Sequence, residues 1–126
     1  MARKIIYTEA APDPIGPYSQ GVFINGTLFI SGQIALDAFA NVLILDSIEK
    51  ETAQVMDNIA AILEAAEMDF SNVVKTSIFL SDMDNFPKVN KVYGEYFGEH
   101  PPARETIEAA RLPRDVNVEI SVIAMR

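Results

Sequence analysis

The chain has 126 residues, 49% of them hydrophobic, which is the usual size of one domain and enough apolar material for a core. It contains no cysteine, which excludes disulfides, thiolate metal sites and a cysteine nucleophile. Its formal charge of −8, without any lysine or arginine cluster, opposes nucleic-acid binding and favours a small ligand, because neutralising phosphates requires a basic face.

The N-terminal segment becomes charged and proline-containing before any long apolar run. No other stretch approaches the roughly 20 apolar residues of a membrane span. We see no linker, repeat or low-complexity tract. We therefore expect one soluble, cytoplasmic domain over residues 1–126.

Short strands open the chain. Residues 4–7 and 21–24 are strand-like, and Asn25 with Gly26 predicts a two-residue hairpin loop. The partner strand is then expected over residues 28–36.

A long helix is predicted next, because Asp46 with Glu49 three residues later resembles a capping box. Apolar and small side chains then recur at helical spacing, at Ile48, Thr52, Val55, Met56, Ile59, Ile62, Leu63 and Ala66. Residues 72–81 are β-branched and alternating, which predicts a strand. The alternation places four residues on one side of this strand, Val74, Thr76, Ile78 and Leu80.

A second helix is indicated by start signals at Asp84, Asn85 and Pro87, and it should end before Pro101. Its apolar stripe is Phe86, Val89, Tyr93 and Phe97. Strands near 103–109 and 116–124 complete the order strand, strand, strand, helix, strand, helix, strand, strand. This order predicts an α+β fold with one sheet and both helices on one face.

In the last strand, the apolar residues Val116, Val118, Ile120, Val122 and Ala124 share one face. That face should meet the helices, so Glu119 on the opposite face points away from the helix core. Ile123 and Met125 also lie on this second face, which is neither fully polar nor obviously buried. We expect such a face in a subunit contact.

Arg104 and Glu119 lie in the two C-terminal strands, which we expect to be neighbours. Arginine is well shaped to grip a carboxylate, and glutamate is a common general base, so this pair is the first candidate for chemistry. A solvated edge arginine, a structural ion pair and a solvated surface glutamate remain open as alternatives.

Four more residues suggest binding, although each also has an ordinary structural explanation. Asn90 lies beside the apolar stripe of the second helix, where a polar amide needs partners unless it faces water. Tyr18 follows the bend in IGPYSQG, and Ser31 with Gly32 opens a place where backbone could approach a ligand. For the segments that carry Tyr18, Ser31 and Gly32, an ordinary turn and an ordinary strand end are the alternatives.

We assign His100 to a helix-dipole role at the end of the second helix.

The segments IGPYSQ, FISGQIALD, VVKTSIFLSDMDNFPKVNKVY and PARETIEAARLPRDVNVEISVIA resemble the reactive intermediate deaminase (RidA or YjgF) family. This family is also described as endoribonuclease L-PSP or translation inhibitor, and the resemblance covers nearly the whole chain. It implies a chorismate-mutase-like α+β fold assembled as a homotrimer, with ligand clefts between subunits. It also implies hydrolysis of 2-imino acids and their enamine tautomers to 2-keto acids and ammonia, without metal or cofactor.

The resemblance also implies roles for residues. Arg104 matches the arginine that clamps the substrate carboxylate, and Glu119 matches the glutamate that positions or activates water. The residues that match the cleft lining are Tyr18, Ser31, Gly32 and Asn90, and Thr106 stands where the family often has a cysteine. Expected substrates are 2-iminopropanoate and 2-iminobutanoate. The alternatives are a non-catalytic carboxylate-binding or regulatory protein and, less favoured, an endoribonuclease or translation inhibitor.

The sequence departs from the family pattern at several places. Residues 38–41 read Ala-Phe-Ala-Asn where a proline and glycine turn is common, and Glu67 follows the first helix where glycine is typical. A left-handed backbone at Glu67 would cost about 1 kcal/mol relative to glycine. Pro101 and Pro102 make the segment before Arg104 shorter and stiffer than in longer family members. This segment should border the cleft.

Overall fold

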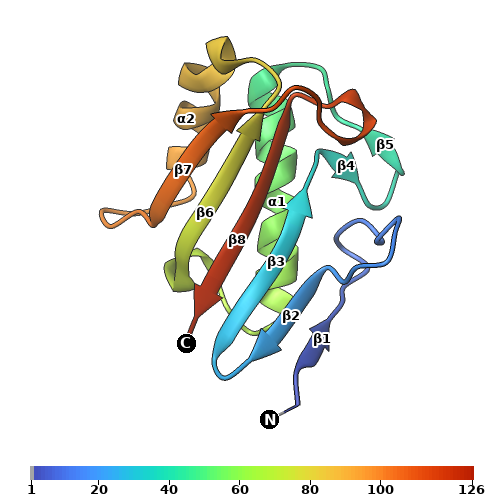
Figure 1. The fold of residues 1–126 in the computed structure, drawn as a ribbon, viewed down its shortest axis with the longest axis vertical. Coiled ribbons are helices and arrows are strands. Elements are labelled where there is room, and N and C mark those ends of the chain that lie inside the picture. The colour runs from blue at the N-terminus through green and yellow to red at the C-terminus, as the bar shows by residue number, and fades with distance from the viewer. Residues whose placement is uncertain (1) are drawn as a thin grey trace.

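The computed structural model describes residues 2–126 (Figure 1). The elements in chain order are β1 (Lys4–Ile6), β2 (Gly21–Ile24), β3 (Thr27–Gln33), β4 (Leu36–Asp37), β5 (Val42–Leu43), α1 (Ile48–Ala65), β6 (Val73–Leu80), α2 (Phe86–Gly94), β7 (Ala103–Glu108) and β8 (Val118–Met125). Short 3-10 turns span Phe70–Asn72, Met83–Asn85 and Pro113–Asp115.

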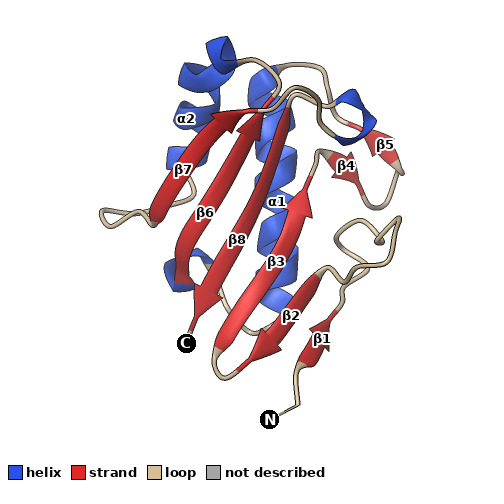
Figure 2. Cartoon of the chain, viewed as in Figure 1, coloured by secondary structure: helices blue, strands red, loops and turns tan. Residues whose placement is uncertain are grey.

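Six strands form one sheet in the order β1-β2-β3-β8-β6-β7, in which only the β6 and β7 pair is parallel. Both helices lie behind this sheet in the view of Figure 2, and its other face is uncovered. The predicted α+β fold with two helices on one face of a mixed sheet is thereby confirmed. No helix within residues 2–126 is long and apolar enough to cross a membrane.

The predicted hairpin is present between β2 and β3. Ile24 pairs with Thr27, and the two loop residues Asn25 and Gly26 have φ of 52° and 77°. Positive φ at both positions is what a type I′ turn requires. The predicted strand 28–36 is interrupted after Gln33, since Leu36 belongs to a separate β4-β5 hairpin that sequence reasoning missed.

The strand over residues 72–81 is also confirmed. At one end, the residues on its buried side differ from the set that the sequence placed on one side. The register between β6 and β8 shifts between Val73 and Lys75, so Val73 is buried while Val74 is 44% exposed. A bulge of this kind turns one residue outward without disturbing the alternation beyond it. Thr76, Ile78 and Leu80 share one side of the strand, as predicted, and that side is buried.

Helix α1 begins one residue later than a cap at Asp46 would require. Ser47 is the N-cap, and its hydroxyl accepts a hydrogen bond from the Lys50 N–H at 3.1 Å. At the other end Glu67 has a φ of 59°, so the left-handed backbone considered from the sequence is present. In α2, Pro87 lies in the first turn, as predicted.

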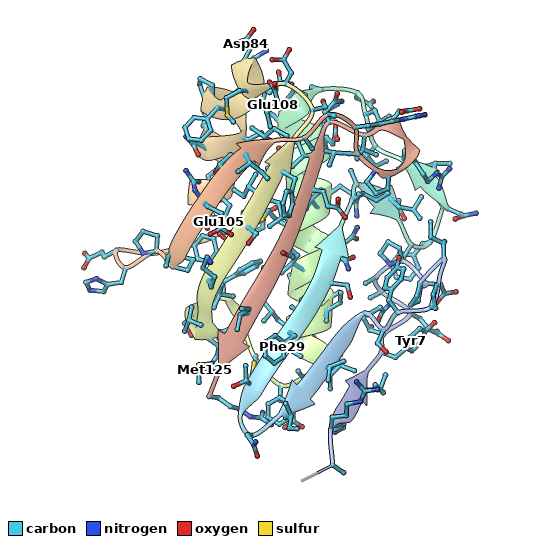
Figure 3. The ribbon with its side chains drawn as sticks, viewed as in Figure 1. Tyr7, Phe29, Asp84, Glu105, Glu108 and Met125 are labelled. Carbon is cyan, nitrogen blue, oxygen red and sulfur yellow. The ribbon has the colours of Figure 1, made fainter. Side chains whose placement is uncertain are left out.

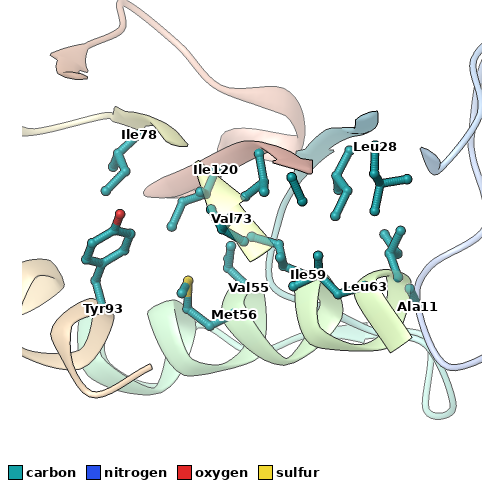
Figure 4. Close-up of a cluster of buried hydrophobic side chains, with 14 of the residues drawn as sticks. Ala11, Leu28, Val55, Met56, Ile59, Leu63, Val73, Ile78, Tyr93 and Ile120 are labelled. Carbon is teal, nitrogen blue, oxygen red and sulfur yellow. The ribbon is translucent and has the colours of Figure 1, made fainter. Parts of the chain in front are cut away.

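The core fills the space between α1 and the sheet (Figure 4). Val55, Ile59 and Leu63 of α1 are fully buried against strands that contribute Leu28 and Ile120. In β8 the predicted apolar face is buried throughout, although the strand itself begins at Val118 instead of 116. Burial on this face leaves Glu119 on the uncovered face.

Candidate functional site

Arg104 lies on the helix face of the edge strand β7, where it pairs in register with buried Thr76. Its guanidinium carbon lies 5.0 Å from the centroid of the Tyr93 ring and 5.4 Å from that of Phe86. The Tyr93 hydroxyl shares a 2.8 Å hydrogen bond with Thr76. Burial raises the pKa of Tyr93, so the ring under the guanidinium stays neutral. Two aromatic faces therefore support the cation.

Around Arg104 is an open depression of about 380 Å³. We call it the Arg104 groove, and it is lined by Asn90, Tyr93, Gly94, Pro101, Pro102 and Arg104. Within residues 2–126, no carboxylate lies within 4.0 Å of the Arg104 guanidinium. The groove thus offers a cation with free hydrogen-bond donors to an anionic ligand.

Thr106 follows Arg104 on the same face of β7, where it pairs with Ile78. Its hydroxyl oxygen is buried and has no hydrogen-bond partner, the one such side-chain atom found within residues 2–126. An unpaired buried hydroxyl is costly unless something outside the chain completes it. Thr106 therefore remains a candidate for contact with a ligand or water.

Glu119 lies in the centre of the sheet on its uncovered face, opposite Phe79 of β6. A β-carbon added at Gly32 would overlap the Glu119 carboxylate, so a larger residue there would force the Glu119 side chain to move. The register between β3 and β8 shifts between Ile30 and Gln33, which places Gly32 in this irregular stretch. Burial raises the pKa of Glu119.

Ser31 and Tyr18 lie on the segments next to Gly32. The Ser31 hydroxyl donates to the Ser19 carbonyl, and the Ser31 N–H donates to the Gln20 carbonyl at 3.0 Å. These bonds fix the segment that carries Tyr18, which is 49% exposed and lines a small cavity together with Gly32. We refer to Tyr18, Ser31, Gly32 and Glu119 as the Glu119 region.

The structure separates the two residues that the sequence suggested as a pair. Strand β6 lies between β7 and β8, so Arg104 and Glu119 are not in neighbouring strands. They also occupy opposite faces of the sheet, because Thr76 beside Arg104 faces the helices while Phe79 beside Glu119 faces away. Asn90 and Thr106 join Arg104, whereas Tyr18, Ser31 and Gly32 join Glu119. The candidate residues of one chain therefore form two separate clusters.

Two other sequence interpretations change. His100 is exposed and lies beyond Gly94, where α2 ends, so it cannot partner the dipole of that helix. Pro101 and Pro102 do border the groove beside Arg104. The Ala-Phe-Ala-Asn loop forms the β4-β5 turn, in which Asn41 takes the left-handed backbone, with a φ of 55°.

Sequence reasoning missed the side chains that support the Arg104 groove and the Glu119 region. Phe86 and Tyr93 were assigned to the core only, although their spacing of seven places both rings on one helix face under Arg104. Glu51 was also missed. Its buried carboxylate accepts hydrogen bonds from the Asn117 N–H and side-chain amide at 2.8 Å and from the Val118 N–H at 3.0 Å. These bonds fix the start of β8 ahead of Glu119.

Known proteins resemble this chain along nearly its full length. The family model described as Endoribonuclease L-PSP matches residues 8–126. A RutC family protein of Pyrococcus horikoshii is 48% identical over 124 residues, covering 98% of each chain. The mouse protein named 2-iminobutanoate/2-iminopropanoate deaminase is 45% identical, covering all of this chain and 93% of the mouse protein.

Among solved structures, the Rid-family protein YyfA of Yersinia pestis superimposes with a TM-score of 0.96. It is 44% identical, and the match covers 99% of this chain and 100% of YyfA. Sequence and fold therefore agree over the same span. The chain belongs to the RidA/YjgF family, which the matching family model describes as Endoribonuclease L-PSP.

Proposed function

We propose that this protein hydrolyses small 2-imino acids, such as 2-iminopropanoate and 2-iminobutanoate, to 2-keto acids and ammonia. The observation that carries this proposal is the Arg104 guanidinium, which two rings hold in an open groove and which has no acidic partner within residues 2–126. Such a fork fits the carboxylate shared by every 2-imino acid. Membership of a family that includes the mouse deaminase supports the same assignment.

Glu119 supplies the proton transfers in this proposal. Water attacks the iminium carbon, a C–O bond forms, the electron pair of the C=N bond moves to nitrogen, and the Glu119 carboxylate takes a proton from the water. Glu119 then protonates the amino nitrogen of the carbinolamine. The C–N bond breaks as the hydroxyl becomes a carbonyl and gives its proton to Glu119. The released ammonia takes that proton as ammonium, which restores the carboxylate. A pKa raised by burial brings a carboxyl closer to neutral pH, where such transfers are efficient.

The complete site in this proposal requires a second copy of the chain, because Arg104 and Glu119 lie on opposite faces of one sheet. The uncovered face carries apolar side chains that suit such a contact. Phe29, Ile107 and Met125 are each close to half exposed, and Figure 3 labels Phe29 and Met125 on strands β3 and β8. We propose a homotrimer in which neighbouring subunits bring the Arg104 groove of one against the Glu119 region of the next.

The test generates 2-iminopropanoate in situ and follows ammonia release with and without the purified protein. We expect clear acceleration, and we expect Arg104→Ala to lower kcat/KM by about 10- to 100-fold, the value of a charge-assisted contact. Arg104→Lys keeps the charge but loses the fork, so it should also be impaired. No acceleration by the wild type, or full activity in Arg104→Ala, would refute the proposal.

A further inference from the structure

Arg114 lies in the turn between β7 and β8 and lines the same small cavity as Tyr18 and Gly32. The cavity measures about 40 Å³. This is a small space, and it suits the polar end of a ligand's side chain. Arg114 therefore borders the Glu119 region directly.

The turn holds Arg114 in a strained conformation. Arg114 and Asp115 have φ of 56° and 58°. Residues other than glycine rarely adopt such backbone angles, which persist only where the surroundings enforce them. The Arg111 side chain donates to the Asp115 carboxylate at 2.7 Å, and the Asp115 N–H donates to the Leu112 carbonyl at 3.0 Å. The turn is therefore braced from within.

Buried Glu51 braces the same turn from the helix side, since it binds the N–H groups of Asn117 and Val118 directly after the turn. Asn117 is held on its other side by Ser81, whose N–H donates to the Asn117 carbonyl at 3.0 Å. Helix α1 and Ser81, directly after β6, thus hold the backbone that follows Arg114.

The charge of Arg114 is not neutralised within the chain. No carboxylate lies within 4.0 Å of it in residues 2–126, and Asp115 is engaged by Arg111. The other charged residue lining the cavity is Asp13, whose carboxylate already accepts the Tyr7 hydroxyl. Arg114 is exposed, and a guanidinium without a carboxylate partner beside a small polar cavity can bind a second anion.

We propose that Arg114 binds a carboxylate at the side-chain end of the substrate, so that the protein accepts 2-imino dicarboxylic acids. This inference rests on the proposed deaminase function, in which Arg104 holds the carboxylate next to the imine. Arg114 then acts as a specificity residue that selects among side chains, at the end of the cleft that carries Tyr18 and Gly32.

The experiment compares 2-oxoglutarate with 2-oxobutanoate, which are stable products with and without a second carboxylate, by calorimetric titration of the whole protein. The matching imines are assayed in parallel by ammonia release. Arg114→Ala should lower the ratio of dicarboxylate to monocarboxylate affinity, and the same ratio of kcat/KM, by about tenfold, the low end for an exposed charge-assisted contact. Arg114→Lys should retain part of the ratio.

Arg3→Ala serves as the control, because it removes the same charge from an exposed residue that does not line the cavity. A ratio that is unchanged in Arg114→Ala, or that falls equally in Arg3→Ala, would overturn the role of Arg114. Failure of the deaminase proposal gives a distinct result, because the wild-type protein would then hydrolyse no imine. The binding ratio tests Arg114 in that case as well.

Discussion

The Arg104 groove and the Glu119 region place their charges in contrasting surroundings. Arg104 projects from an edge strand over two aromatic rings and opens to solvent, whereas Glu119 lies on a central strand over a glycine and is partly desolvated. The first arrangement keeps a cation available for binding. The second raises the pKa of a carboxyl, as proton transfer near neutral pH requires. In the proposed function, carboxylate binding and proton transfer thus belong to opposite faces of one sheet.

Glu119→Gln tests this division most severely. Glutamine keeps the size of the side chain but cannot accept a proton, so we expect kcat to fall by about 10²- to 10⁴-fold, the usual contribution of a general base. Affinity for 2-oxobutanoate, measured by calorimetry, should change little because Arg104 is intact. Loss of binding in proportion to kcat would mean that the two regions do not have separate roles in carboxylate binding and proton transfer. Binding without any turnover in the wild type would instead favour a carboxylate-binding protein.

Gly32→Ala asks whether the Glu119 region depends on the position of its carboxylate. The added β-carbon would meet the Glu119 carboxylate and displace it, so we expect about a tenfold loss of kcat from misorientation. Gly98→Ala is the matched control, because a β-carbon there meets nothing within 4 Å. Equal activity in the two variants would show that Glu119 tolerates displacement.

The raised pKa of Glu119 also predicts how stability depends on pH. The folded protein keeps a proton on Glu119 at pH values at which the unfolded chain has lost it, so the free energy of unfolding falls as pH rises through that interval. Glu119→Gln lacks this titration. We expect the melting temperature of Glu119→Gln to rise relative to that of the wild type as pH increases above about 4.3, the ordinary pKa of a glutamate. Parallel melting curves across this range would contradict the effect.

Glu67→Gly should affect stability while leaving both regions unchanged. Glu67 has a left-handed backbone, and its ion pair with Arg126 is long, at 3.8 Å, and exposed. Glycine should therefore raise the free energy of unfolding by about 1 kcal/mol. Glu64→Gly, within α1, should lower it by a similar amount. Chemical denaturation measures both, and a destabilised Glu67→Gly would refute the assignment of strain.

Local patterns predicted most of the fold. The positive-φ pair Asn25 and Gly26, the alternation of β8 and the helical spacing in α1 each act over a few residues, so the sequence shows them directly. The bulge that leaves Val74 exposed could not be predicted from the sequence, because a register shift depends on the partner strand. The insertion of β6 between β7 and β8 was hidden for the same reason, since strand order is a property of the whole sheet.

The candidate site was predictable in its residue types more than in its geometry. Alternation placed Glu119 away from the helices, but it could not show that Arg104 faces them. The close approach of the Glu119 side chain to Gly32 joins residues far apart in sequence. The role of Glu51 in bracing β8 also needs the fold, because a glutamate in the first turn of a helix otherwise indicates only a favourable dipole contact.

The central claim is that one complete site takes Arg104 from one copy of the chain and Glu119 from another. Co-assembly of Arg104→Ala with Glu119→Gln tests it, after each variant has been shown to be nearly inactive alone. Random mixing in equal amounts should restore about a quarter of the wild-type activity, because one in four subunit contacts then carries both intact residues. Activity no higher than the sum of the two separate variants would contradict a shared site.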